Sequence, residues 1–194
     1  MVRDTDTRQR VVQAAAELFR RQGYHATGLN QILELGQAPK GSLYFHFPGG
    51  KEQLAAEAIS LSGSELSEVF DVVLGAAPAP NVAIVQLAEL LASMLEASDY
   101  REGCPIATVA LDASADSDAI RTACDGAYRR WLETAAGHFR SWGVTEGEAW
   151  SLATLVLSSF EGALVRARVQ CDVAVVRSVA QMLGDLVDEA IYRG

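Results

Sequence analysis

Apolar residues recur at steps of three and four residues through most of this chain, which is the spacing of one face of an α-helix. Val12 and Phe19 belong to such a stripe near the start, and Val176, Leu183 and Ile191 belong to another near the end. No segment alternates β-branched residues between hairpin turns, as the strands of a half-buried sheet would. The sequence therefore predicts an all-α fold.

Glycine and proline divide this pattern into separate helices. We expect a first helix at about 7–22, ended by Gly23. A second helix would be capped by Thr27 and ended by Gly36. A proline-bearing hinge at 75–81 separates the early helices from the later ones. The other helices are expected at about 40–45, from about 51, at 82–97, from about 106, and at 117–142, 145–170 and 173–192.

The chain has 194 residues, of which 49% are hydrophobic, so it can form one large domain or a small domain fused to a larger one. No uninterrupted apolar run approaches the roughly 18 residues that a membrane span needs. The first ten residues are polar and include two aspartates, unlike a signal peptide. We expect a cytoplasmic protein with no membrane partner.

The cysteines and histidines are too scattered to suggest a disulfide framework or a zinc site. We expect the cysteines to be free thiols buried in the core. We also expect no metal and no cofactor. The residues concerned are Cys104, Cys124, Cys171, His25, His46 and His138.

Charge is unevenly distributed along the chain, whose formal net charge is −9. Residues 1–51 contain seven Lys and Arg against four Asp and Glu, whereas residues 52–194 contain nine against twenty-one. The first segment is therefore net +3 and the second net −12. An acidic protein with a mildly basic N-terminal segment can contact nucleic acid through that segment alone.

The basic segment ends in APKGSLYFHFPGGK, residues 38–51, which contains no acid and has three aromatic residues within four positions. Two short helices that meet near Gly36, with another helix before them, make a helix-turn-helix arrangement. A helix of a few residues buries little surface and can enter the major groove of DNA.

Individual side chains of this stretch suit DNA contacts. Lys40 can reach a phosphate or a guanine edge, and the small Gly41 and Ser42 let the backbone approach the duplex. The Tyr44 hydroxyl can bind a phosphate, with Tyr44 and His46 expected to face outward.

The residues around this helix are expected to anchor it. Phe45 and Phe47 are expected to pack inward, and Leu43 either contacts a thymine methyl group or belongs to the core. Lys51, together with backbone N–H groups at the start of the next helix, would clamp a phosphate. Thr27 would do the same on the other side of the groove.

The chain from Phe19 to Lys51 closely resembles the DNA-binding domain of the tetracycline-repressor (TetR) family. The matching motifs are F-x-x-x-G-[YF] at 19–24, K-G-x-[LIV]-Y-x-[HY]-F at 40–47, and the lysine at 51. The Gly-Cys-Pro around Cys104 and the Pro-Gly-Gly before Lys51 resemble the LmrA/YxaF-like branch. Ala38 and Pro39 replace the usual valine and serine, so Pro39 receives no DNA role.

This resemblance implies a homodimeric transcriptional repressor with a helix-turn-helix domain at 1–50 and a helical effector-binding and dimerisation domain at 51–194. Two DNA-binding domains about 34–36 Å apart would bind a pseudo-palindromic operator. The last two long helices would form the dimer, helped by small residues at 158–163. A small apolar or aromatic effector would release the DNA.

The apolar body could hold a cavity for such an effector. The aromatic candidates for its lining could equally be core residues, and Arg166 could instead form a surface ion pair with Glu161. The candidate effector-binding residues are Met94, Tyr128, Trp131, Phe160 and Arg166.

Two other functions fit the residues less well. The sequence has no nucleophile–base–acid set, phosphate loop or metal spacing, and Cys104 is the one candidate nucleophile, so we expect no enzyme. A protein-binding adaptor that uses the acidic body would lack salt-sensitive affinity for DNA.

Overall fold

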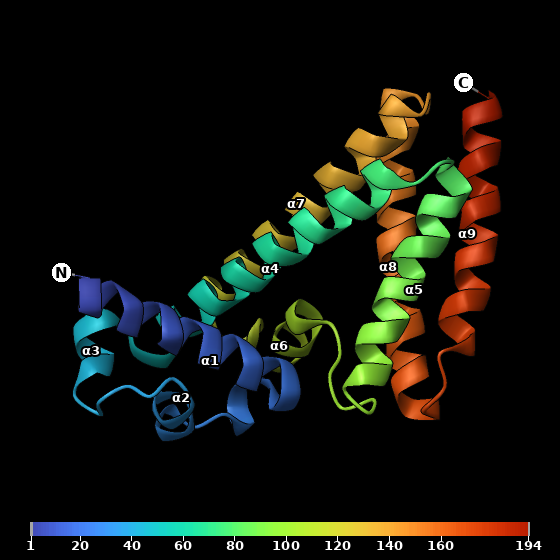
Figure 1. Ribbon diagram of the computed structural model, residues 1–194. Helices are drawn as coiled ribbons and strands as arrows, with labels where there is room; N and C mark the ends of the chain where they lie inside the picture. The colour runs from blue at the N-terminus through green and yellow to red at the C-terminus, as the bar shows by residue number, and fades with distance from the viewer. Residues whose placement is uncertain (1, 194) are drawn as a thin grey trace. The chain divides into compact units, whose positions relative to one another are not determined.

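The computed structural model describes residues 2–193, and the side chains of residues 6–192. The all-α prediction is confirmed, because the described residues form nine helices and no strand (Figure 1). None of these helices is long and apolar enough to cross a membrane. The helices are α1 (Val2–Ala26), α2 (Leu29–Leu35), α3 (Ser42–His46), α4 (Gly50–Ala76), α5 (Pro80–Ala97), α6 (Pro105–Ala113), α7 (Asp118–Ser141), α8 (Glu146–Gln170) and α9 (Ala174–Arg193).

The chain divides into two compact units. Unit 1 comprises residues 2–65 and 104–128, and unit 2 comprises residues 66–103 and 129–193. Unit 1 thus combines the basic N-terminal segment with α6 and with the first parts of α4 and α7. The functional division after residue 50 stays a prediction.

Unit 1 is organised around α1, which packs against α2 and α6. Its core consists of apolar residues at helical spacing, including Val11, Phe19, Ile32, Leu54 and Ile106, all fully or almost fully buried. The α4 and α7 backbones also approach closely, since a Cβ on Gly63 would lie 2.7 Å from the Ala127 Cβ. These contacts give unit 1 a core of its own.

The first helix departs from the predicted boundaries at both ends. It begins at Val2 rather than near residue 7, and its assignment continues to Ala26 across a kink at Gly23. Gly23 has φ +79° and ψ 177°, a conformation that a residue with a Cβ rarely adopts. Gly23 therefore marks a sharp bend within α1 and not the predicted end of the helix.

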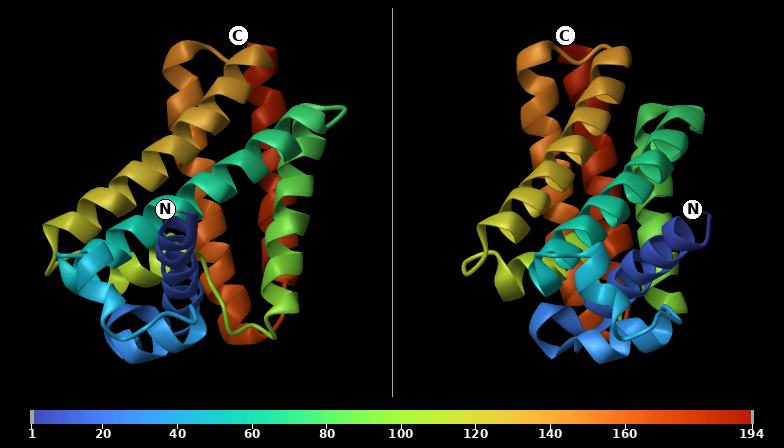
Figure 2. Two further views of the ribbon diagram at one scale, coloured as in Figure 1. Left: turned by 60° about the vertical axis from the view of Figure 1, so that its left-hand side comes forward. Right: turned by 90° about the vertical axis from the view of Figure 1, so that its left-hand side faces the viewer.

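Unit 2 is built on α5, α8 and α9, which run side by side in every ribbon view (Figures 1 and 2). The later parts of α4 and α7 also meet there, where the Phe70 and Trp131 rings pack edge to face with centroids 5.4 Å apart. The hydroxyls of Ser67 and Thr134, 3.0 Å apart, satisfy each other beside this pair. Arg177 of α9 binds both carboxylate oxygens of Glu89 of α5, at 2.8 and 3.0 Å.

The cysteines do not share one environment. Cys124 is buried, and burial raises the pKa of its thiol to about 11. Cys104 is half-buried and Cys171 is exposed, so the expectation that all three lie in the core is wrong. Cys171 ends α8 in a left-handed conformation, which places it at a turn and not on a packed helix face.

Candidate nucleic-acid interface

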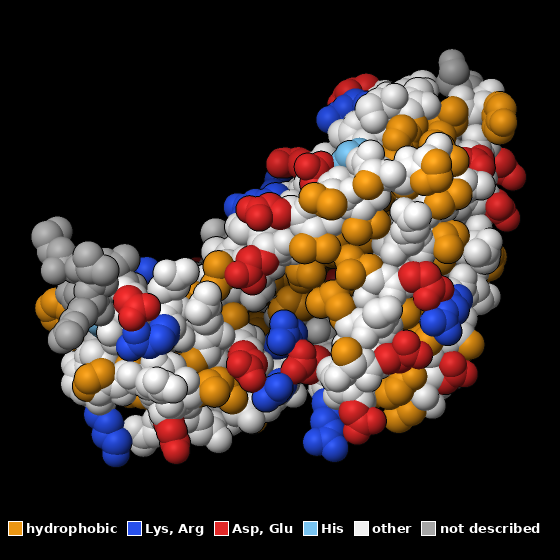
Figure 3. Space-filling model, in the orientation of Figure 1, with side chains coloured by type: hydrophobic (Ala, Val, Ile, Leu, Met, Phe, Trp, Pro, Cys, Tyr) orange, Lys and Arg blue, Asp and Glu red, His pale blue; other side chains and the backbone are white. Residues whose placement is uncertain are grey.

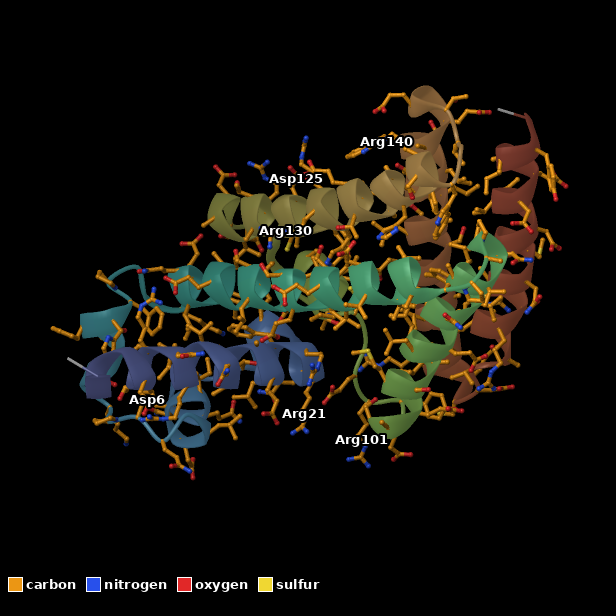
Figure 4. The ribbon with its side chains drawn as sticks, turned by 45° about the horizontal axis from the view of Figure 1, so that its top comes forward. Asp6, Arg21, Arg101, Asp125, Arg130 and Arg140 are labelled. Atoms are coloured by element: carbon orange, nitrogen blue, oxygen red, sulfur yellow. The ribbon has the colours of Figure 1, made fainter. Side chains whose placement is uncertain are left out.

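The turn between α2 and α3 is fixed on α1 by close backbone packing at Gly36. A Cβ at this position would lie 3.2 Å from the Arg10 carbonyl oxygen and the Val11 Cα, so a larger residue would push α2 away. The Arg10 guanidinium donates from Nε to the Gly36 carbonyl over 3.1 Å and also binds the Asp6 carboxylate. Asp6 lies on α1, as Figure 4 shows. The chain therefore leaves α2 in a direction that α1 determines.

Helix α3 is short and is held from one side only. The Ser42 N–H and hydroxyl both donate to the Pro39 carbonyl, at 2.9 and 2.7 Å, and this closes its first turn. Leu43 and Phe47 are 3% and 0% exposed and anchor the helix in unit 1. Leu43 therefore lies in the core, the second of the two environments predicted for it.

The prediction that Phe45 packs inward is wrong. Phe45 is 72% exposed and its neighbour Tyr44 is 67% exposed. The physical reason is the helical period, since residues 43 and 47, four apart, share one face and residue 45 points to the opposite one. The spacing of two apolar anchors could have revealed this from the sequence.

The other residues around α3 differ in exposure. Lys40 and Gly41 are exposed, while Ser42 and His46 are half-buried. The His46 ring lies edge-on to Phe45 and Phe47, with centroid distances of 5.0 and 6.3 Å. We call Lys40, Gly41, Ser42, Tyr44, Phe45 and His46 the α3 surface.

Thr27 is neither a helix cap nor a surface residue. The N-cap of α2 is Gly28, whose N–H donates to the Gln31 Oε1 over 2.9 Å. Thr27 is 1% exposed, and its hydroxyl donates to the Gly23 carbonyl over 2.7 Å. The Thr27 hydroxyl therefore stabilises the bend at Gly23, and the contact of Thr27 with DNA stays a prediction.

Lys51 lies in the first turn of α4 and rests on an aromatic ring. Its Nζ lies 4.3 Å from the centroid of Tyr24, a cation–π contact. Burial lowers the pKa of Lys51, while the charge of Asp112 raises it. Burial, and then the charge of Glu52, raise the pKa of Tyr24. The lysine is thus half-buried and oriented, unlike the exposed Lys40.

The predicted effector residues are divided between the units. Tyr128 belongs to unit 1, and the other four belong to unit 2. Trp131 and Phe160 are buried, whereas Met94 and Arg166 are exposed. Burial of Trp131 and Phe160 agrees with a core role as well as with a pocket lining, so the effector site stays a prediction.

The sequence comparisons define the class of protein to which this geometry belongs. Residues 11–58 match the model of the bacterial regulatory proteins of the tetR family. Residues 80–182 match that of the LmrA/YxaF-like transcriptional regulator C-terminal domain. Both matched models describe transcriptional regulators and not enzymes. A short helix-turn-helix exposed on unit 1, followed by a helical C-terminal domain, is the arrangement of a DNA-binding regulator. The chain belongs to the TetR family, in its LmrA/YxaF branch.

Individual relatives agree with this assignment. The regulator LmrA of Bacillus subtilis is 36% identical over 160 residues, which cover 82% of this chain and 85% of LmrA. YxaF of the same organism is 34% identical over 182 residues, covering 94% and 95% of the two chains. The fold matches that of a CifR cysteine mutant complexed with operator DNA, with a TM-score of 0.76, 21% identity and coverage of 91% and 94%. The resemblance stated from the sequence is confirmed.

The opposite environments of Phe45 and Phe47 give a direct test of this geometry. Phe47→Ala should lower the free energy of unfolding by about 3–5 kcal/mol, because it empties a fully buried site. Phe45→Ala should change it by less than about 0.5 kcal/mol, because the ring is exposed. Urea unfolding followed by circular dichroism measures both. Equal losses would mean that α3 is rotated from the orientation described.

Proposed function

We propose that this protein is a cytoplasmic, ligand-responsive repressor that binds a pseudo-palindromic operator as a homodimer. The observation that carries the proposal is the α3 surface, in which two large aromatic side chains project from a helix held by Leu43 and Phe47, with an exposed lysine just before that helix. A helix held on one side and bare on the other can enter the major groove without losing core contacts. The CifR mutant, whose fold this chain shares, is complexed with operator DNA, which supports DNA binding by this chain.

The side chains of the α3 surface have distinct roles in the proposal. Lys40 contacts a phosphate or a guanine edge, and the Tyr44 hydroxyl binds a phosphate. The Phe45 ring replaces Leu43 as the apolar group that meets a thymine methyl group. Gly41 and Ser42 allow close approach, and His46 binds a phosphate beside them.

Lys51 forms a second phosphate contact, separate from the α3 surface. It lies one residue inside the N-terminus of α4, where backbone N–H groups carry partial positive charge. Its contact with Tyr24 restricts where the ammonium group can reach. Lys40 and Lys51 then bracket the helix that reads the bases.

Removing charge or aromatic surface should weaken operator binding. Lys40→Ala and Tyr44→Ala should each reduce affinity by about tenfold, and Lys40→Ala should also reduce the salt dependence by about one ion. The probe is a labelled duplex that the wild-type protein enriches from a random-sequence library, titrated by fluorescence anisotropy. Arg101→Ala, an exposed arginine of unit 2, is the control and should bind like wild type. Wild-type binding by both test variants would contradict the contact assignment.

Dimerisation through α8 and α9 is supported by an unpartnered stripe on α8. Leu155, Val165 and Val169 are exposed, and the small residues Ser158 and Gly162 lie between them at the same helical spacing. A Cβ on Gly162 would meet nothing within 4 Å. On α9, Met182 and Tyr192 are also exposed, and Figure 3 shows apolar side chains at the surface of unit 2. A two-fold contact between copies would bury this stripe.

A charge placed within the stripe should separate the copies. Val165→Asp should change the protein from dimer to monomer, because a buried carboxylate without a partner is costly. Light scattering coupled to size-exclusion chromatography measures the mass. Leu111→Asp on α6, where the side chain is also exposed, should leave the dimer intact. A wild-type monomer, or a dimeric Val165→Asp protein, would refute this interface.

We propose that the effector binds in the aromatic interior of unit 2. Trp131 packs on Phe70 there, and Phe160 is buried in the same unit. A flat apolar compound that raises Tm and releases the operator should bind Trp131→Phe several-fold more weakly, since the indole provides more contact area. Trp150→Phe, at a half-exposed site on α8, is the matched control. Calorimetric titration of both variants decides whether Trp131 contacts the compound.

A further inference from the structure

One acidic side chain of α6 contacts the bend at the end of α1. The Asp112 carboxylate accepts a hydrogen bond from the backbone N–H of His25 over 2.7 Å. Its Oδ2 also lies 3.0 Å from the position that a Cβ on Gly23 would occupy. Both partners belong to unit 1, so the contact joins the end of α1 to α6 at the surface of that unit.

The bend explains why His25 needs this acceptor. Gly23 has non-helical backbone angles, and such a break interrupts the series of N–H to carbonyl hydrogen bonds along a helix. The Asp112 carboxylate supplies an acceptor for the His25 N–H at this break. Because a hydrogen bond to a charged group is stronger than one between neutral groups, Asp112 can hold the bend firmly.

Tyr24 lies between Gly23 and His25 in the chain, and its ring contacts Lys51. Its ring lies beneath the Lys51 ammonium group, with 4.3 Å from Nζ to the centroid. The Phe19 ring packs against it at 5.8 Å, which fixes its position on α1. Asp112 also acts on Lys51 directly, because its charge raises the lysine pKa while burial lowers it. The Asp112 carboxylate therefore acts on Lys51 in two ways. It holds the bend that carries the Tyr24 ring, and its charge favours the protonated ammonium group.

We propose that Asp112 is a positioning residue for DNA binding, which holds the Gly23–His25 bend so that Tyr24 directs Lys51 toward a phosphate. The proposal rests on the proposed function, in which Lys51 contacts DNA. Asp112 itself does not touch the duplex. It acts through the backbone of His25 and through the ring of Tyr24.

The experiment compares variants at Asp112 with a matched acid. Asp112→Ala removes the acceptor, whereas Asp112→Asn keeps an oxygen in the same place. Asp116→Ala removes the same charge from an exposed site shortly after α6. Affinity for the duplex enriched by the wild-type protein is measured at several salt concentrations, alongside Tm.

Asp112→Ala should bind about tenfold more weakly, as expected for loss of a hydrogen bond to a charged group. Its salt dependence should fall by about one ion, as it should in Lys51→Ala, because the ammonium no longer reaches its phosphate. The double variant should bind within about twofold of Lys51→Ala, since the two residues act through one contact. Asp112→Asn should bind with an affinity between those of wild type and Asp112→Ala, because it keeps the acceptor but loses the charge, and Asp116→Ala should not lose affinity.

A general loss of stability would lower the amount of active protein without changing the salt dependence. An unchanged salt dependence in Asp112→Ala, additive effects with Lys51→Ala, or an Asn variant as weak as the Ala variant would each overturn the proposal. If Asp112→Ala does not fold, Asp112→Glu replaces it, because the longer side chain keeps the charge but displaces the acceptor. Binding of the Glu variant with wild-type affinity and salt dependence would also overturn it. Failure of the wild-type protein to enrich any duplex would instead refute the proposed function.

Discussion

The exposed surface of α3 depends on the burial of two side chains, Leu43 and Phe47. A helix of five residues is not stable by itself, because the cost of its first turn exceeds what so few hydrogen bonds return. Tertiary packing has to supply the difference, and these two residues provide it from one face. The opposite face is left free, and that freedom is what a DNA-reading helix needs.

A second constraint is the sharp bend at Gly23, on which the rest of the N-terminal segment is arranged. The bend brings together three otherwise separate interactions: the Thr27 hydroxyl on the Gly23 carbonyl, the His25 N–H on Asp112, and the Tyr24 ring beneath Lys51. Two of these partners are distant in sequence. Helix α6 and the start of α4 thus take part in shaping a segment that lies before them in the chain.

Much of this could be read from the sequence, for identifiable reasons. Long amphipathic helices are recognisable because apolar residues recur every three or four positions, and glycine and proline mark where such helices end. The fold class and most helix boundaries were therefore predictable. The basic segment and its motif identified the family. Two predictions failed for different reasons. Thr27 had two allowed environments, since it could cap a helix or form a hydrogen bond within a bend. Phe45 was placed inward although the four-residue spacing of Leu43 and Phe47 already puts residue 45 on the opposite face.

The sequence by itself therefore determined an all-helical chain with a DNA-binding segment at its start. Helical periodicity, glycine and proline breaks, and the helix-turn-helix motif are all local properties of the sequence. Only the tertiary structure decided that Thr27 is buried, which residue caps α2, and that Asp112 meets the end of α1. Those outcomes depend on how helices distant along the chain pack together. The Asp112 carboxylate accepts a hydrogen bond from the N–H of a residue 87 positions away, and no local sequence pattern predicts such a contact.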